Sequence, residues 1–294
     1  MEKTIKSVVA EQYDGKRISE YLRRGMGLSL TLVKRVKWGG VSLRGEVVHM
    51  RATVHTGDTV EVRLPVAKSE NITPREMPIS VVYEDEYFIA VDKPAGMPTH
   101  PSRGNHLPTL AEGLCAYFAP EPFVFRSVNR LDRDTSGIVL VAKDQHTASL
   151  LAKEMKAGGF LKKYLALLSS TPTLQSGIID APIAREAEGN VKRVVREDGK
   201  RAVSEYRVAK ILPDGRCIAD ITLHTGRTHQ IRVHMAHIGS PLYGDFLYGE
   251  RVEGESYLLH AYSLNLTHPY SGEELRLLTS GYDEIMGNGE FGKP

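Results

Sequence analysis

The chain has 294 residues, of which 41% are hydrophobic and 25% are charged. This length and composition are typical of a globular protein of about two domains and exclude disordered, collagen-like and disulfide-scaffold proteins. No apolar run approaches the roughly 20 residues of a membrane helix, and the first residues resemble neither a secretory signal nor an anchor. We therefore expect a cytoplasmic protein with no membrane partner. Cys115 and Cys217 lie far apart, which argues against a zinc ribbon or a redox dithiol.

The net charge of +2 hides a strongly basic segment near the N-terminus. Residues 16–44 contain eight basic side chains and one acidic side chain, so this segment carries +7 and the rest of the chain carries −5. Such a run is often the solvated face of a helix. Binding to RNA phosphates is the alternative interpretation.

The basic segment is expected to form two short helices. Apolar residues from Ile18 onward have helical spacing, and a second helix is expected to begin at the N-cap Ser29 and to end at the Gly-Gly pair 39–40. Short strands should follow, the first two joined by a turn at 44–45. Three basic residues of the second helix are expected to face outward: Lys34, Arg35 and Lys37.

The basic second helix, the Gly-Gly pair and the segments VSLRGEVV and GDTVEV together resemble the small RNA-binding domain named after ribosomal protein S-four. The resemblance covers residues 14–66. It implies that an RNA backbone lies against the second helix and the following hairpin, which assigns RNA contacts to Lys34, Arg35, Lys37 and Arg44. Residues 67–78 show no apolar period and are interpreted as a linker.

Residues 79–281 are expected to form a second, strand-rich domain. The predicted strands lie around 79–83, 88–91, 138–141, 164–168, 203–208 and 217–223. Helices are predicted at 146–155 and 228–236, the latter with Thr228 as its N-cap. This pattern predicts an α+β fold, in which a largely antiparallel mixed sheet with a central cleft follows a small N-terminal α/β domain. Residues 282–294 are expected to be a flexible tail.

The densest polar cluster, NRLDRDTSG at 129–137, lies directly before an apolar strand. Surface pairing between its Arg and Asp residues is one explanation of the cluster. Because arginines flank Asp132 and Asp134, both carboxylates should be ionised, which disfavours a glycosidase-type general acid. An ionised Asp132 suits a nucleophile or a base.

A second polar cluster, TGRTHQIRVH at 225–234, places cationic side chains at the start of a predicted helix. Arg227 and Arg232 can bind an anion there, either a phosphate or the Asp132 carboxylate. Three nearby histidines are expected to pack or to form hydrogen bonds rather than to bind a metal. They are His229, His234 and His237.

Five separated segments follow one another along the second domain. They are DKPAGMPTHP from Asp92, NRLDRDTSG, KKYLAL from Lys162, TGRTHQIRVH and LLHAYSLNLTHP from Leu258. In this order they resemble the pseudouridine synthases of the RluA type, and several ordered motifs are far more specific than a single one. The resemblance implies an enzyme that isomerises uridine to pseudouridine in RNA and needs neither a cofactor nor a metal.

The resemblance also implies roles for individual residues. Asp132 matches the essential aspartate, a nucleophile or a base, and Arg232 matches the basic residue that pairs with it. Tyr164 matches the tyrosine that packs on the uracil and helps to remove the proton from C5. Arg130 matches the arginine that fills the gap left by the flipped base, and Arg227 is assigned to RNA contact.

One position departs from the family pattern, because Asn129 stands where a His is usual. An Asn can hydrogen-bond a phosphate or a backbone group but carries no proton at neutral pH, so catalysis should survive and fine substrate contacts should change. The resemblance implies large-subunit ribosomal RNA as the substrate. The alternatives are a synthase acting on transfer RNA and a catalytically silent RNA-binding or ribosome-assembly factor. We expect a monomer.

Overall fold

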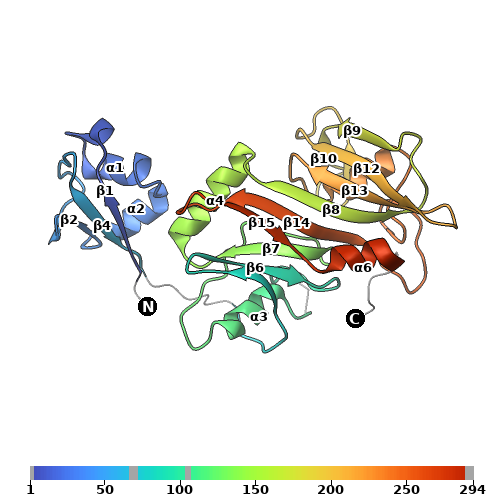
Figure 1. Ribbon diagram of the computed structural model, residues 1–294, viewed down its shortest axis with the longest axis horizontal. Coiled ribbons are helices and arrows are strands. Elements are labelled where there is room, and N and C mark those ends of the chain that lie inside the picture. The colour runs from blue at the N-terminus through green and yellow to red at the C-terminus, as the bar shows by residue number, and fades with distance from the viewer. Residues whose placement is uncertain (1–2, 66–71, 103–106, 289–294) are drawn as a thin grey trace.

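The computed structural model describes residues 3–65, 72–102 and 107–288, which form two units (Figure 1). A small N-terminal unit ends near residue 65, and a larger, strand-rich unit follows it. Part of the expected linker, 67–71, lies outside the described residues, and 72–78 contain no helix or strand. Among the helices described, none is long and apolar enough to cross a membrane.

The N-terminal unit packs two helices on one antiparallel sheet. Its strands are β1 (Thr4–Val8), β2 (Val41–Leu43), β3 (Glu46–Val47) and β4 (Thr59–Arg63), in the order β1-β4-β2-β3. A 3₁₀ turn at Glu11–Tyr13 precedes the helices α1 (Ile18–Arg24) and α2 (Leu30–Val36).

Both helices predicted for the basic segment are confirmed. The Ser29 side chain caps α2, because it accepts a hydrogen bond from the Leu32 amide at 3.2 Å. Ile18, Leu22 and Leu32 are fully buried and belong to one apolar cluster with residues of the sheet. The unit therefore has a hydrophobic core of its own.

Strand β1 extends this unit beyond the expected range of 14–66. It pairs antiparallel with β4, so that Ile5 lies opposite Val62. Of its five residues only Ile5 is buried, so no apolar alternation marks the segment in the sequence. Pairing with a strand that is distant in the chain makes this segment a strand.

In the described part of the larger unit, nine strands form one mixed sheet. The order along its main path is β5-β6-β7-β14-β8-β13-β12-β9, and β15 pairs with β14. The pair of β7 and β14 is parallel and the other pairs are antiparallel, which confirms the expected largely antiparallel mixed sheet. The strands are β5 (Ser80–Glu84), β6 (Phe88–Lys93), β7 (Ser136–Ala142), β8 (Leu161–Leu168), β9 (Ser176–Asp180), β12 (Val203–Ile211), β13 (Cys217–Leu223), β14 (Leu259–Thr267) and β15 (Glu274–Leu278).

The larger unit also contains a hairpin and several helices. The hairpin consists of β10 (Ile183–Arg185) and β11 (Arg193–Val195), and the helices are α3 (Leu110–Tyr117), α4 (Gln145–Ala157), α5 (Gln230–His237) and α6 (Gly281–Asn288). The helix predicted at 146–155 is α4, which begins at the N-cap Asp144. The prediction of Thr228 as the N-cap of α5 is wrong, because His229 takes that place with a left-handed backbone at φ 58°.

The expected flexible tail is wrong for residues 282–288, which belong to α6. Ile285 is fully buried, and Tyr282 and Met286 pack against the same cluster, which includes Tyr262 of β14. These residues have helical i, i+3, i+4 spacing, but the segment is short and rich in glycine. Packing against the sheet therefore decides its structure. Residues 289–294 lie outside the described part of the chain.

The two units meet at the start of α4. The Lys3 ammonium lies 3.0 Å from the Asp144 carboxylate. His146 Nε2 lies 2.7 Å from the Met26 carbonyl oxygen, which can only accept, so this nitrogen carries a proton. The other ring nitrogen accepts from the Tyr270 hydroxyl at 2.8 Å. Burial lowers the pKa of His146, which favours the neutral ring that this arrangement requires.

We expect Gly137→Ala to destabilise the protein by more than about 3 kcal/mol. Gly137 lies on β7 at φ 110°, and a Cβ there would overlap the backbone of Ala261 on β14. Gly215 provides the matched control, because it also has a positive φ, at 87°, but a Cβ would meet open space. Gly215→Ala should cost only about 1 kcal/mol. Denaturant unfolding would measure both, and equal losses would contradict the argument.

Candidate active site

A pocket of about 360 Å³ lies where β8, the loop before β7 and the start of α5 meet. Its volume is within the range of about 300–1,000 Å³ that is usual for small-molecule sites. The predicted catalytic residues line it, together with two of the predicted RNA contacts: Asp132, Tyr164 and Arg232, with Arg130 and Arg227. The polar clusters at 129–137 and 225–234 therefore meet at one site.

Asp132 stands in the loop before β7, and its side chain is 32% exposed. Its Oδ2 lies 3.6 Å from Arg232 Nη1 and 3.7 Å from His229 Nε2. Both distances are longer than a hydrogen bond. The carboxylate thus has a positively charged neighbour and remains accessible from the pocket.

The segment DKPAGMPTHP holds the Asp132 loop in place. Lys93 is fully buried, and its ammonium donates to the Arg133 carbonyl oxygen at 3.1 Å and to two carbonyl oxygens of its own segment. Thr99 donates to the Leu131 carbonyl oxygen at 2.9 Å. Burial lowers the pKa of Lys93 to about 8, against the opposite effect of nearby carboxylates. This sequence segment therefore supports the loop that carries Asp132.

Asn129 fastens the other end of the same loop to β7. Its amide donates to the Ile138 carbonyl oxygen at 2.9 Å, and its side-chain oxygen accepts from the Leu140 amide at 2.8 Å. The sequence allowed either a phosphate or a backbone group as the partner of Asn129. In the structure, this side chain hydrogen-bonds backbone groups.

Arg232 is held by an acidic side chain and two aromatic rings. Its Nε and Nη2 donate to the two carboxylate oxygens of Asp245, both at 2.7 Å, and its guanidinium lies 4.3 Å from the Tyr257 ring and 5.0 Å from the Tyr248 ring. The side chains of Arg232 and Asp245 are 5% and 0% exposed. Burial alone would lower the pKa of Arg232, but the hydrogen bonds to Asp245 raise it, so the guanidinium stays charged. The remaining nitrogen, Nη1, is the one nearest Asp132.

Asp245, Tyr248 and Tyr257 are absent from the sequence prediction. The sequence indicates Asp245 only weakly, as the one charged residue in the stretch PLYGDFLYG at 241–249. Charged residues are rarely buried unless they are paired, so a buried position for Asp245 would have required a cation nearby. Only the fold shows that this cation is Arg232.

His229 presents an N–H to Asp132. The Tyr248 hydroxyl accepts from the Arg193 amide at 2.9 Å and lies 2.7 Å from His229 Nδ1. Because the Tyr248 hydroxyl already accepts from Arg193, we assign its own proton to the hydrogen bond with Nδ1 of His229. The proton of the neutral ring is then on Nε2, the nitrogen nearest Asp132. Burial lowers the pKa of His229, although the charge of Asp132 acts in the opposite direction.

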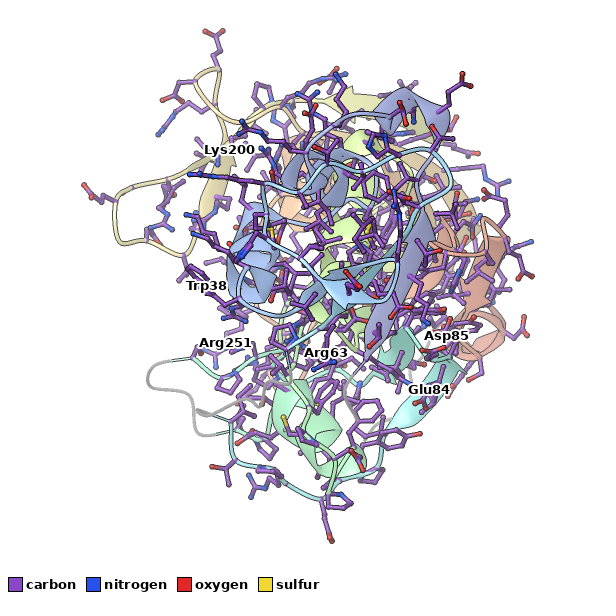
Figure 2. All side chains as sticks on the ribbon, turned by 90° about the vertical axis from the view of Figure 1, so that its left-hand side faces the viewer. Trp38, Arg63, Glu84, Asp85, Lys200 and Arg251 are labelled. Carbon is purple, nitrogen blue, oxygen red and sulfur yellow. The ribbon has the colours of Figure 1, made fainter. Side chains whose placement is uncertain are left out.

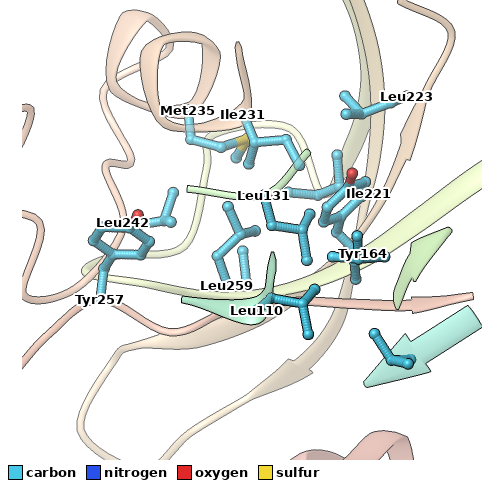
Figure 3. Close-up of a cluster of buried hydrophobic side chains, with 14 of the residues drawn as sticks. Leu110, Leu131, Tyr164, Ile221, Leu223, Ile231, Met235, Leu242, Tyr257 and Leu259 are labelled. Carbon is cyan, nitrogen blue, oxygen red and sulfur yellow. The ribbon is translucent and has the colours of Figure 1, made fainter. Parts of the chain in front are cut away.

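Tyr164 lies on β8 among apolar side chains, beside Ile221 of the adjacent strand (Figure 3). It belongs to the same buried cluster as Leu131 and Leu259, and it is 7% exposed. Burial, together with the charge of Asp132, raises the pKa of Tyr164. The phenol is therefore neutral at physiological pH.

The other predicted RNA contacts differ in their surroundings. Arg130 and Arg227 are exposed at the pocket, and Arg227 also donates to the Arg201 carbonyl oxygen at 2.9 Å. Lys34 and Lys37 are exposed on the N-terminal unit.

Two of the basic residues assigned to RNA also form hydrogen bonds with other parts of the protein. Arg35 donates to the side chain of the first residue of α4 at 3.2 Å. Arg44 lies in the turn between β2 and β3, and its Nε and Nη2 donate to the Asp58 carboxylate at 2.6 and 3.1 Å. Both arginines contribute to the structure of the N-terminal unit and its docking.

Trp38 follows α2 and projects from the N-terminal unit (Figure 2). Its side chain is 78% exposed, and the Lys37 ammonium lies 4.8 Å from its ring. An exposed ring next to basic residues is a surface on which nucleic-acid bases can stack. The sequence analysis did not predict a role for Trp38.

Among the residues described, no three or more His, Cys, Asp or Glu side chains gather as metal ligands would. His234 hydrogen-bonds the Ser204 hydroxyl and the Ala181 carbonyl oxygen, both at 2.9 Å, which is the role the sequence favoured for it.

Comparison with known proteins defines the class of this chain. Residues 87–237, which include most of the pocket, match the family model described as RNA pseudouridylate synthase. The chain is 36% identical over 258 residues to ribosomal large subunit pseudouridine synthase D of Xanthomonas campestris pv. campestris, covering 82% of this chain and 77% of that protein. It is 35% identical to the uncharacterized RNA pseudouridine synthase YjbO of Bacillus subtilis, covering 85% of this chain and 90% of that protein.

A solved structure agrees with these matches. Human RNA pseudouridylate synthase domain containing 1 aligns with a TM-score of 0.58 and 28% identity, over 69% of this chain and 83% of that chain. The chain belongs to the RNA pseudouridine synthase family, whose members convert uridine in RNA to pseudouridine.

We expect Asp245→Asn to lower the stability of the protein by about 3 kcal/mol, because it leaves the buried Arg232 charge without its partner. A matched control is Asp214→Asn, which removes an acid paired with Arg216 in a more exposed place. The control should leave the melting temperature almost unchanged. Thermal unfolding at neutral pH would measure both, and a stable Asp245→Asn protein would show that Arg232 does not need this carboxylate.

Proposed function

We propose that this protein converts uridines of large-subunit ribosomal RNA to pseudouridine in the cytoplasm, with Asp132 as its essential carboxylate. Several of the relatives are ribosomal large subunit pseudouridine synthases, including the Xanthomonas protein, which supports this choice of substrate. The observation that carries the proposal is the accessible Asp132 carboxylate in a pocket beside Arg232, whose position Asp245 and two rings hold.

The reaction is an isomerisation. The bond between N1 of uracil and C1′ of ribose breaks, the base rotates, a bond forms between C5 and C1′, the C5 proton leaves, and N1 takes up a proton. Asp132 acts either as a nucleophile or as a base in this sequence, and both roles require its ionised form. The Arg232 guanidinium places a positive charge 3.6 Å from this carboxylate. Because atoms and oxidation level do not change, the reaction fits the expectation that no cofactor takes part.

Tyr164 is proposed to pack against the uracil. Its apolar surroundings suit the face of a base, and stacking on an aromatic ring offsets part of the cost of flipping a base out of a helix. Its raised pKa disfavours the phenolate, and so favours this packing role over removal of the C5 proton. Arg130 and Arg227, exposed at the pocket, are proposed to contact the surrounding RNA.

The N-terminal unit is proposed to be an RNA-binding domain like that of ribosomal protein S-four. Lys34, Lys37 and Trp38 form an exposed, basic and aromatic surface on and just after α2. Such a surface attracts phosphates through its charge and bases through its ring. Arg35 and Arg44, which are bonded within the protein, contribute charge to it without being its main contacts.

We expect Asp132→Asn to lower pseudouridine formation at least about 1,000-fold, because a neutral amide replaces the carboxylate. Asp134→Asn, two residues along the same loop and paired with Arg133 at 2.8 Å, should keep most of the activity. Large-subunit ribosomal RNA transcripts and transfer RNAs would be incubated with each protein, and pseudouridine mapped by its selective chemical derivatisation. Conversion of transfer RNA alone would overturn the proposed substrate, and an active Asp132→Asn protein would overturn the proposed role.

We expect the double variant Lys34→Gln, Lys37→Gln to bind RNA more weakly and with less dependence on salt. Each lost phosphate contact should lower the slope of log affinity against log salt by roughly 0.7 to 1. Lys6→Gln is the control, since Lys6 follows the buried Ile5 on β1 and so faces away from the helices. Filter binding at several salt concentrations gives the slopes. If the double variant has the same slope as the wild type, Lys34 and Lys37 are only solvated side chains that do not contact RNA phosphates.

A further inference from the structure

Lys162 is a pocket residue to which the mechanism gives no role. It lies on β8 two residues before Tyr164, so the alternation of a strand places both side chains on the same face. The burial of β8 agrees, because Tyr164 and Ala166 belong to the apolar cluster next to the pocket and Leu165 belongs to a cluster on the opposite face. Lys162 lines the pocket, whereas Lys163 points to the other side of the sheet.

The Lys162 ammonium makes no hydrogen bond or ion pair with any residue in 3–65, 72–102 or 107–288. Burial lowers its pKa, and no carboxylate opposes this effect, so Asp132 is not its partner. No fully buried side-chain nitrogen or oxygen in the described residues lacks a hydrogen-bond partner, so this ammonium is still open to the pocket. In the loop before α5, a Cβ added at Gly226 would stand 3.4 Å from Lys162 Nζ.

A partly buried cation without an anion is costly, since burial removes much of its hydration. An anion that enters the pocket would offset this cost more than a neutral carbonyl oxygen would, because its full negative charge adds a Coulomb attraction to the hydrogen bond that the ammonium donates. The ligand of this pocket is a uridine within RNA, and the anionic groups of RNA are its phosphates. The chemistry of Lys162 therefore matches the backbone of the target nucleotide better than its base.

We propose that the Lys162 ammonium binds a phosphate directly adjacent to the target uridine and so anchors the backbone of the flipped nucleotide beside Tyr164. The inference rests on the proposed location of the active site in this pocket. It makes Lys162 a positioning residue, which holds the nucleotide and takes no part in bond breaking.

The test measures the coupling between Lys162 and single phosphates. The probe is a short stem-loop RNA that carries a uridine converted by the wild-type protein. It is synthesised unmodified, with a neutral methylphosphonate at the 5′ or the 3′ phosphate of that uridine, or with one several nucleotides away. Affinities are measured in the Asp132→Asn background, to prevent turnover, for proteins with Lys162, Lys162→Met or the matched control Lys163→Met.

We expect Lys162→Met to weaken binding of the unmodified RNA about 10-fold. One of the two adjacent methylphosphonates should weaken binding to the Lys162 protein by a similar factor and should have no further effect on the Lys162→Met protein. Two controls should show no coupling. Lys163→Met should leave the effect of each methylphosphonate unchanged, and the distant methylphosphonate should have the same effect on the Lys162 and Lys162→Met proteins. Lys162→Arg, which keeps the charge, should retain affinity and sensitivity to the same phosphate, which separates loss of contact from misfolding.

Two results would overturn the proposal. One is that Lys162→Met and each methylphosphonate act independently, and the other is that Lys162→Met is coupled instead to replacement of the uracil O4 oxygen. Failure of the proposed active site would be seen separately, as conversion of the unmodified RNA by the Asp132→Asn protein during the binding measurement.

Discussion

The buried ion pair between Arg232 and Asp245 is the interaction on which the site depends. Taking both charges out of water costs several kcal/mol for each ion, and only close, two-point hydrogen bonding offsets that cost. Asp245 satisfies this condition by accepting from Nε and Nη2, which leaves Nη1 toward Asp132. The same carboxylate accepts from the Leu247 amide at 3.1 Å, so it also orients the segment that carries Tyr248. The geometry around Asp132 follows from this pair.

The sheet supplies the site as well as supporting it. On β8, alternate residues face the pocket side and the opposite apolar cluster, so the strand that bears Tyr164 is also a central element of the core. The Asp132 loop is fastened at both ends, by Asn129 to β7 and by Lys93 to the carbonyl oxygen of Arg133. A carboxylate that must meet a substrate carbon needs such a rigid support, because small displacements of a reacting group lower rates strongly.

The charged side chains have different roles in the two units of the protein. The basic N-terminal segment is not one uniform surface, since Arg35 contacts α4 and Arg44 closes a turn through Asp58. The lysines of α2 and its C-terminal end remain exposed beside Trp38. In the larger unit, Arg232 compensates nearby carboxylates. The small net charge of +2 is therefore the sum of oppositely charged groups that lie in different parts of the structure and have different roles.

The two N-terminal helices, the strand-rich second unit and the polar clusters that line the pocket could all be predicted from the sequence alone. These depend on local apolar spacing and on ordered motifs, which a linear pattern records. Other features could be seen only in the folded chain: Thr4–Val8 is a strand, and Gly281–Asn288 is a helix. Asp245 holds Arg232, and Lys162 faces the pocket without a partner in the described part of the chain. The reason is physical: these features depend on pairing and burial between distant parts of the chain, and such contacts exist only after the sheet has formed.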